Sequence, residues 1–286
     1  MCLELDFILL EMLPEARIVI DLNDLPSEVA DVFYLEYDFD ISAAEAIVRQ
    51  GHQLFLYHLG DEKANKDLSA YRLAKHVFRN YFHQSIFDDP AFRDKLSWLP
   101  NGYRNGLLRQ QATANLPASK RKFFASFMGW INNPNAYGNE RTLFAQAAEA
   151  SKPHLAVLST PGFAGGFASH LYGWHLAQTV LAPCPAGNAA ETIRLFDALE
   201  MGCIPITTRL PFLNEDRAFR QAPFIFIDHW DEISSLLENS RKLHSIDSLT
   251  LEERQLACIQ YWRALKESYR SNIRITTFLA SRRHIA

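Results

Sequence analysis

Short apolar runs alternate with amphipathic helical stretches twice along this chain, and this rhythm restricts the fold more than any other feature. The strands predicted in the first half are residues 17–20, 32–35, 54–57, 76–78 and 97–99. Those predicted in the second half are residues 123–128, 155–158, 179–183, 203–207 and 224–227. Strands that are separated by helices pair in parallel, with helices on both faces. We therefore expect an α/β protein with two Rossmann-like, doubly wound sheets.

A polar stretch without periodicity, residues 109–122, separates the two halves and is the predicted linker. A chain of 286 residues has room for two domains. We place the N-terminal domain at residues 1–115 and the second domain at residues 116–270. A C-terminal helix over residues 271–286 is expected to return toward the first domain.

Composition excludes several classes of protein. The net charge of -4 argues against a protein whose main task is to bind a nucleic-acid backbone. No apolar run approaches the ~20 residues of a membrane span, and the first residues lack the basic start of a signal peptide. The four cysteines form no CxxC pair, which favours buried thiols in a reducing compartment. We expect a cytoplasmic protein.

The segment over residues 180–206 carries the most chemical information. A buried strand is followed by the small-residue turn Pro185-Ala186-Gly187, which lets the backbone approach a ligand closely. Asn188 is expected to cap a helix over residues 188–201, whose free N–H groups form an anion site. Glu191, Arg194 and Asp197 share one helix face, while Ile193, Phe196 and Leu199 share the other.

This arrangement suits a nucleotide diphosphate, with arginine for phosphate and a carboxylate for ribose hydroxyls. The alternative is that Glu191 and Arg194 simply pair on a solvated surface.

The same residues resemble a known family. Gly187-Asn188, then Arg194-Leu195-Phe196-Asp197-Ala198-Leu199, then Gly202-Cys203-Ile204-Pro205-Ile206 is similar to the donor-binding signature of the exostosin-like glycosyltransferases, family 47. Weaker collinear similarities extend over residues 54–230. Glu191 and Thr192 depart from the family pattern, which often has small residues or serine there. Many members have a membrane anchor and disulfides, and we expect neither in this chain.

The resemblance implies a GT-B architecture, in which two Rossmann-like domains face a cleft. The C-terminal domain would bind a nucleotide sugar and the N-terminal domain the acceptor. Such enzymes invert the anomeric centre and need no metal or other cofactor, which agrees with the absence of Asp-x-Asp from this sequence. The branch that this chain resembles most transfers xylose, so UDP-xylose is the expected donor.

Donor-binding residues are proposed from the turn, the helix and the first strand and helix of the second domain. Arg194 is the first choice for stabilising the leaving diphosphate, and Arg141 is the second. Phe163 lies in a Gly-rich loop, where it either stacks the nucleobase or packs into the core. The full donor set is Gly129, Arg141, Phe163, Gly187, Asn188, Glu191, Thr192, Arg194 and Asp197.

The base that deprotonates the acceptor hydroxyl should follow a strand of the first domain. Asp61 and Glu62 have that position, and Asp38 and His58 are rivals; a solvated acidic loop is the structural alternative. The predicted acceptor residues are His58, Asp61, Arg79, Tyr81 and Tyr103. For Tyr172, Trp174 and His175, core packing is favoured over stacking on a sugar ring.

The expected function is transfer of a sugar from a UDP-sugar to a hydroxyl of a glycan acceptor, with inversion. One alternative is a non-catalytic carbohydrate-binding or partner subunit with the same fold. A second is a dinucleotide-dependent oxidoreductase, although Gly162, Gly165 and Gly166 lack the spacing and the position of the dinucleotide fingerprint. The sequence leaves the acceptor and the oligomeric state open.

Overall fold

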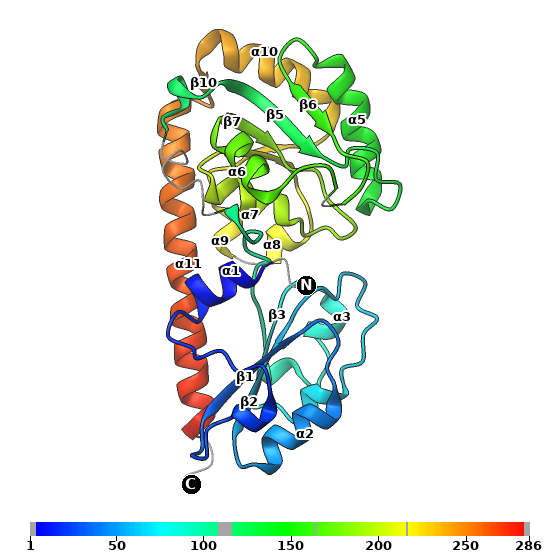
Figure 1. The fold of residues 1–286 in the computed structure, drawn as a ribbon. Coiled ribbons are helices and arrows are strands. Elements are labelled where there is room, and N and C mark those ends of the chain that lie inside the picture. Colours follow the sequence, from blue (N-terminus) through cyan, green and yellow to red (C-terminus); the bar gives the residue numbers. More distant parts are fainter. Residues whose placement is uncertain (1–3, 108–115, 164, 216, 283–286) are drawn as a thin grey trace. The chain divides into compact units, whose positions relative to one another are not determined.

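A computed structural model describes residues 4–107, 116–163, 165–215 and 217–282. The chain divides into two compact units, which are described separately. Unit 1 comprises Met1–Asn101 and Lys266–Ala286, and unit 2 comprises Gly102–Leu265. Each unit contains one parallel sheet with its helices (Figure 1). The predicted α/β class with two Rossmann-like sheets is confirmed.

Unit 1 is built on a four-stranded parallel sheet in the order β1-β2-β3-β4. Its strands are β1 (Asp31–Glu36), β2 (Gln53–His58), β3 (His76–Arg79) and β4 (Leu96–Trp98). Its short helices are α1 (Leu5–Phe7), α2 (Ile41–Arg49) and α3 (Gln84–Phe87). Helix α2 begins where the Asp40 side chain accepts a hydrogen bond from the Ser42 N–H at 2.8 Å. The predicted strand at residues 17–20 is wrong; this segment lies at the surface, and Ile20 is 98% exposed.

Unit 2 contains a five-stranded parallel sheet in the order β6-β5-β7-β8-β9. The strands are β5 (Phe123–Gly129), β6 (Ala156–Ser159), β7 (Thr179–Pro183), β8 (Ile204–Thr208) and β9 (Ile225–Ile227). The helices are α5 (Glu140–Ala150), α6 (Ser169–Ala177), α7 (Ile193–Glu200), α8 (Phe212–Glu215), α9 (Arg217–Arg220) and α10 (Ile233–Leu243). A small hairpin of β10 (Ser245–Ile246) and β11 (Leu249–Thr250) precedes the last helix.

Helix α7 begins five residues later than the sequence suggested. Thr192 is its N-cap residue, and the Asn188 side chain instead accepts a hydrogen bond from Asn133 Nδ2 at 3.0 Å. The predicted division into a ligand face and a core face is also absent, because every residue of α7 from Ile193 to Leu199 is buried. The charged side chains of Arg194 and Asp197 are therefore enclosed by the protein and shielded from solvent.

The ends of unit 2 differ from the predicted domain limits. The compact units change at Asn101, and residues 108–115, which include the first half of the predicted linker, lie outside the described part of the chain. The last helix, α11 (Leu251–Arg282), runs without a break through the expected boundary at residue 270. Its Trp262 side chain donates to Glu200 in unit 2, at 2.7 Å, and its Lys266 pairs with Glu11 in unit 1, at 2.9 Å. Among the described helices, none combines the length and apolar character that crossing a membrane requires.

Candidate functional site

Three arginines of unit 2 alternate with two aromatic rings, an arrangement that we call the guanidinium column. The Arg104 guanidinium lies 4.2 Å from the Tyr172 ring centre, and the Arg194 guanidinium lies 5.6 Å from the same ring centre. Arg194 also lies 4.1 Å from the Phe127 ring, which Arg141 approaches to 5.2 Å. Contacts between a guanidinium and an aromatic face stabilise the cation, especially away from water.

The column lies at the carboxyl end of the unit 2 sheet, because its members come from elements that meet there. Phe127 is near the end of β5, Arg141 is in the first turn of α5, and Arg194 is in the first turn of α7. Gly129 ends β5, and a Cβ atom at this position would overlap the Arg194 guanidinium. In open parallel sheets, ligands bind outside the carboxyl ends of the strands.

Arg141 and Arg194 are buried without a carboxylate partner among the described residues. Arg194 Nη2 donates to the Met128 carbonyl at 2.5 Å, while its buried Nε atom has no hydrogen-bond partner in the described part of the chain. Arg141 donates to the Ala186 carbonyl at 2.7 Å and to the Trp130 carbonyl at 3.4 Å. Burial, and then the charge of Arg194, lower the pKa of Arg141 to about 9. Two such cations form a site suited to an anion.

The Asp197 carboxylate binds another residue of the protein, whereas the sequence predicted that it would bind ribose hydroxyls. Its carboxylate is fully buried and accepts from the Arg104 main-chain N–H at 2.8 Å and from Arg104 Nε at 2.9 Å. Desolvation raises the pKa of Asp197, and the Arg104 charge opposes that rise. Both carboxylate oxygens are therefore used to hold Arg104 beside Tyr172. Only the tertiary structure brings Arg104 to this position, and sequence reasoning did not identify it.

The other predicted donor residues differ in burial and in local contacts. Glu191 and Thr192 are buried just before α7. The Gly187 carbonyl accepts from the Tyr137 N–H at 2.8 Å, which anchors the turn. Phe163 is 59% exposed in the loop after β6, so the core-packing alternative for it is wrong. His175 is buried and contacts Ser126 Oγ at 2.7 Å, in agreement with its predicted core role.

Tyr172 has a more specific role than the core packing that was favoured for it. Its ring lies in the guanidinium column, and its buried hydroxyl has no hydrogen-bond partner among the residues that the structure describes. Burial strongly raises the pKa of this phenol, which keeps it neutral beside the arginines. A buried polar atom of this kind indicates a place where a ligand or water is expected.

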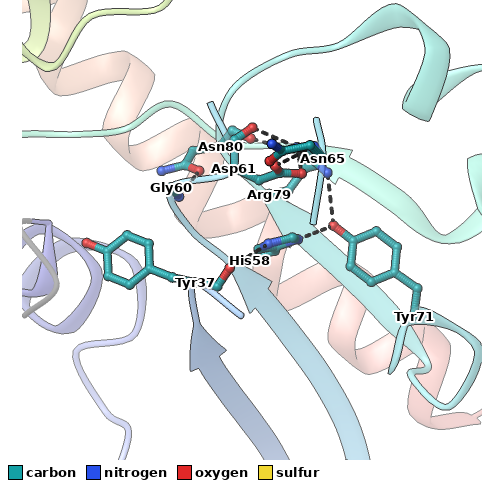
Figure 2. A network of polar contacts seen from close by, with 8 residues as sticks. All are labelled: Tyr37, His58, Gly60, Asp61, Asn65, Tyr71, Arg79 and Asn80. Atoms are coloured by element: carbon teal, nitrogen blue, oxygen red, sulfur yellow. Dashed lines mark hydrogen bonds and ion pairs between the residues drawn. The ribbon is translucent and has the colours of Figure 1, made fainter. Parts of the chain in front are cut away.

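In unit 1, a chain of buried polar groups connects the ends of three strands (Figure 2). His58 Nδ1 lies 2.6 Å from the Tyr71 hydroxyl, and Arg79 Nη1 donates to the same hydroxyl at 3.2 Å. Arg79 Nη2 pairs with Asp61 Oδ2 at 3.1 Å, with both side chains almost completely buried. His58 Nε2 lies 3.2 Å from the Tyr37 carbonyl, which accepts a hydrogen bond only from a protonated nitrogen. His58 Nδ1 must then accept from Tyr71.

Burial, followed by the charge of Arg79, lowers the pKa of His58 to about 4. The unfolded chain therefore binds this proton before the folded protein does, and stability is lost as the pH falls from about 6.5 toward 4. For His58 the expected loss between pH 8 and pH 5 is ~2 kcal/mol. Urea unfolding at both pH values should show that the free energy of unfolding changes less with pH in His58→Gln than in the wild type. The exposed His170→Gln control should keep the wild-type difference; equal pH dependence in all three proteins would contradict this assignment.

The structure separates the predicted acceptor residues into two groups. His58, Asp61 and Arg79 are buried in the polar chain. Tyr81, two residues after the end of β3, donates a hydrogen bond from its hydroxyl to Glu62 Oε1 at 3.2 Å. Tyr103 is buried in unit 2 and not in the unit that holds the other four.

Of the two rival bases, Asp38 is exposed and pairs with Lys66 at 2.9 Å. Among the described residues, no group of three or more potential ligands (His, Cys, Asp or Glu) is placed to hold a metal ion.

The fold defines the class of this protein as GT-B. One similar solved structure is Anabaena Alr3699/HepE in complex with UDP-glucose, with a TM-score of 0.51 and 12% identity, covering 84% of this chain and 78% of that one. Another is α,α-trehalose 6-phosphate synthase from Burkholderia multivorans, with a TM-score of 0.53 and 9% identity, covering 90% and 73%.

The family follows from the sequence. A profile of the RXYLT1 C-terminal domain matches residues 103–279, more than half of the chain, and the chain belongs to this family. Ribitol-5-phosphate xylosyltransferase 1 of Danio rerio is 27% identical over 112 residues, 35% of this chain. The match spans about a quarter (24%) of the length of that curated relative. Membership of the exostosin-like family 47 stays a prediction.

Proposed function

We propose that this protein is a glycosyltransferase that moves xylose from UDP-xylose to a hydroxyl of a glycan acceptor, with inversion and without a metal ion. The observation that carries this proposal is the pair of buried arginines, Arg141 and Arg194, at the carboxyl end of the unit 2 sheet. The family supports the transferase class. The name of the Danio rerio relative supports xylose as the sugar.

The guanidinium column provides what a departing diphosphate needs. Negative charge grows on the diphosphate as the bond to the sugar breaks, and fixed cations stabilise it most strongly where water is excluded. Arg194 is oriented by the Met128 carbonyl, and its unpartnered Nε keeps one donor available for a ligand. Arg141 supplies a second charge, and its carbonyl partners hold it in place. This pair would do the work that a metal ion does in other transferases.

Inversion requires a single displacement at the anomeric carbon. The acceptor hydroxyl attacks the face opposite the diphosphate and gives its proton to a base. Asp61 and Glu62, after β2 in unit 1, are the proposed source of that base. The side chains of Arg79 and His58 are enclosed by protein and would shape this region, while Tyr81 lies next to Glu62.

Nucleotide binding, measured once without and once with EDTA, tests the proposal. UDP or UDP-xylose at a hundred times the dissociation constant should add ~2.7 kcal/mol of stability, measurable as a rise in melting temperature. The same shift is expected in EDTA, because the arginines carry the charge. Affinity lost in EDTA and restored by Mn²⁺ would contradict metal independence.

The remaining outcomes decide between the alternative functions. UDP release from UDP-xylose supports the transferase. Binding without any release would instead indicate a non-catalytic partner subunit. A shift with NADH and none with UDP would favour the oxidoreductase.

A further inference from the structure

Three contacts hold the loop after β2 in unit 1, and the Asp61 carboxylate makes two of them. The Gly60 N–H donates to Asn80 Oδ1 at 3.0 Å, which fixes the start of the loop. Asp61 pairs with Arg79, and its other oxygen accepts from the Asn65 N–H at 3.0 Å, which closes the loop on itself. Figure 2 shows these contacts converging beside the buried polar chain. Glu62 directly follows Asp61 and is the first of the three residues between Asp61 and Asn65.

Tyr81, two residues after the neighbouring strand β3, holds the Glu62 side chain. Its hydroxyl donates to Glu62 Oε1 at 3.2 Å. Tyr81 itself has a left-handed backbone, with φ of +54°, which is costly for an aromatic residue. The phenol is therefore placed against Glu62 at the expense of local strain, and strain of this kind concentrates at functional sites.

Asp61 and Glu62 are adjacent, but the structure gives them different roles. Asp61 is 2% exposed, and each of its carboxylate oxygens is bonded inside the protein. Glu62 is half-buried, and the hydrogen bond from Tyr81 occupies one of its oxygens. A general base needs a lone pair that can reach the substrate. Glu62 meets this condition and Asp61 does not.

We propose that Glu62 is the general base of the transfer reaction, with Asp61, Arg79 and Tyr81 as positioning residues. This inference rests on the proposed function. The Glu62 carboxylate takes the proton of the acceptor hydroxyl, and the oxygen of that hydroxyl forms the bond to the anomeric carbon. The bond from that carbon to the diphosphate oxygen breaks, and its electron pair leaves with UDP. Glu62 then returns the proton to water.

The test compares Glu62→Gln with the wild type, using UDP-xylose first with water alone and then with ribitol 5-phosphate as acceptor. Glutamine keeps the shape and the acceptor oxygen for Tyr81 but cannot take a proton. We expect kcat for UDP release to fall by ~10²–10⁴-fold. UDP affinity and melting temperature should stay at the wild-type values, because the nucleotide site and the loop contacts are intact.

Two further variants complete the design. Glu45→Gln changes an exposed glutamate of α2 in the same unit and should keep full activity. Tyr81→Phe should lower kcat about tenfold with the KM for UDP-xylose unchanged, since it removes the hydrogen bond that orients Glu62. If Glu62→Gln fails to fold, Glu62→Asp decides: its carboxylate is retained but withdrawn, and kcat should fall at least tenfold.

The outcomes separate this inference from the proposed function. Glu62→Gln or Glu62→Asp protein that releases UDP at the wild-type rate would overturn the assignment of Glu62 and leave the transferase proposal standing. Wild-type protein that binds UDP but releases none from UDP-xylose would remove both.

Discussion

Arg194→Met is expected to lower kcat by ~10²-fold or more while leaving the melting temperature unchanged or higher. The reason is that Arg194 is a buried cation with one carbonyl partner and one unpartnered nitrogen among the described residues. Burial of a charge without a carboxylate partner opposes folding, and an apolar side chain of similar length removes that cost. Methionine also fills the space against the Phe127 ring, which alanine would leave empty.

The functional loss has a separate cause. The guanidinium is expected to stabilise charge that develops on the diphosphate, and methionine offers no donor there. Steady-state kinetics with UDP-xylose and a thermal melt of the same preparation measure both effects. Loss of stability together with unchanged kcat would show that Arg194 is structural.

Arg121→Met is the matched control, because Arg121 is another buried arginine of unit 2. It donates to the carbonyl groups of Leu116, Leu176, Thr179 and Met201. Its removal takes one donor from each of these four carbonyl groups, so stability should fall by several kcal/mol. Opposite signs of the stability change in the two arginine variants would separate a ligand-binding cation from a structural one.

Asp197→Ala is expected to destabilise the protein by ~3–5 kcal/mol, the usual cost of removing one member of a buried ion pair. Asp197 is completely buried, and the substitution removes the carboxylate that accepts from the Arg104 main-chain N–H and from Arg104 Nε. Urea unfolding of the single variants and of the double variant with Arg104→Ala measures the coupling between the two side chains.

The expected signature is strong coupling, with the double variant less destabilised than the sum of the single changes. The competing hypothesis, a carboxylate that binds ribose hydroxyls, predicts weaker UDP binding at nearly normal stability. Wild-type stability in Asp197→Ala would therefore contradict the structural role of this residue.

Local patterns of the chain account for much of the fold. Apolar runs identified the four strands of the first sheet and the five strands of the second within one or two residues. These runs succeed because a strand buried on both faces needs uninterrupted apolar residues, which are visible locally. The pattern failed at residues 17–20, where an apolar run is exposed and pairs with no strand. Period and hydrophobicity alone cannot reveal whether a partner strand exists.

The roles of the polar residues, by contrast, were set by contacts between distant parts of the chain. Glu191, Arg194 and Asp197 are spaced as one helix face, so the sequence directed all three toward a ligand. Arg104 lies 93 residues from Asp197, yet its backbone and side chain both bind that carboxylate. Spacing along a helix determines which side chains share a face. Only the packed structure determines which of them are satisfied by the protein and which, as with the Arg194 guanidinium, retain a donor for a ligand.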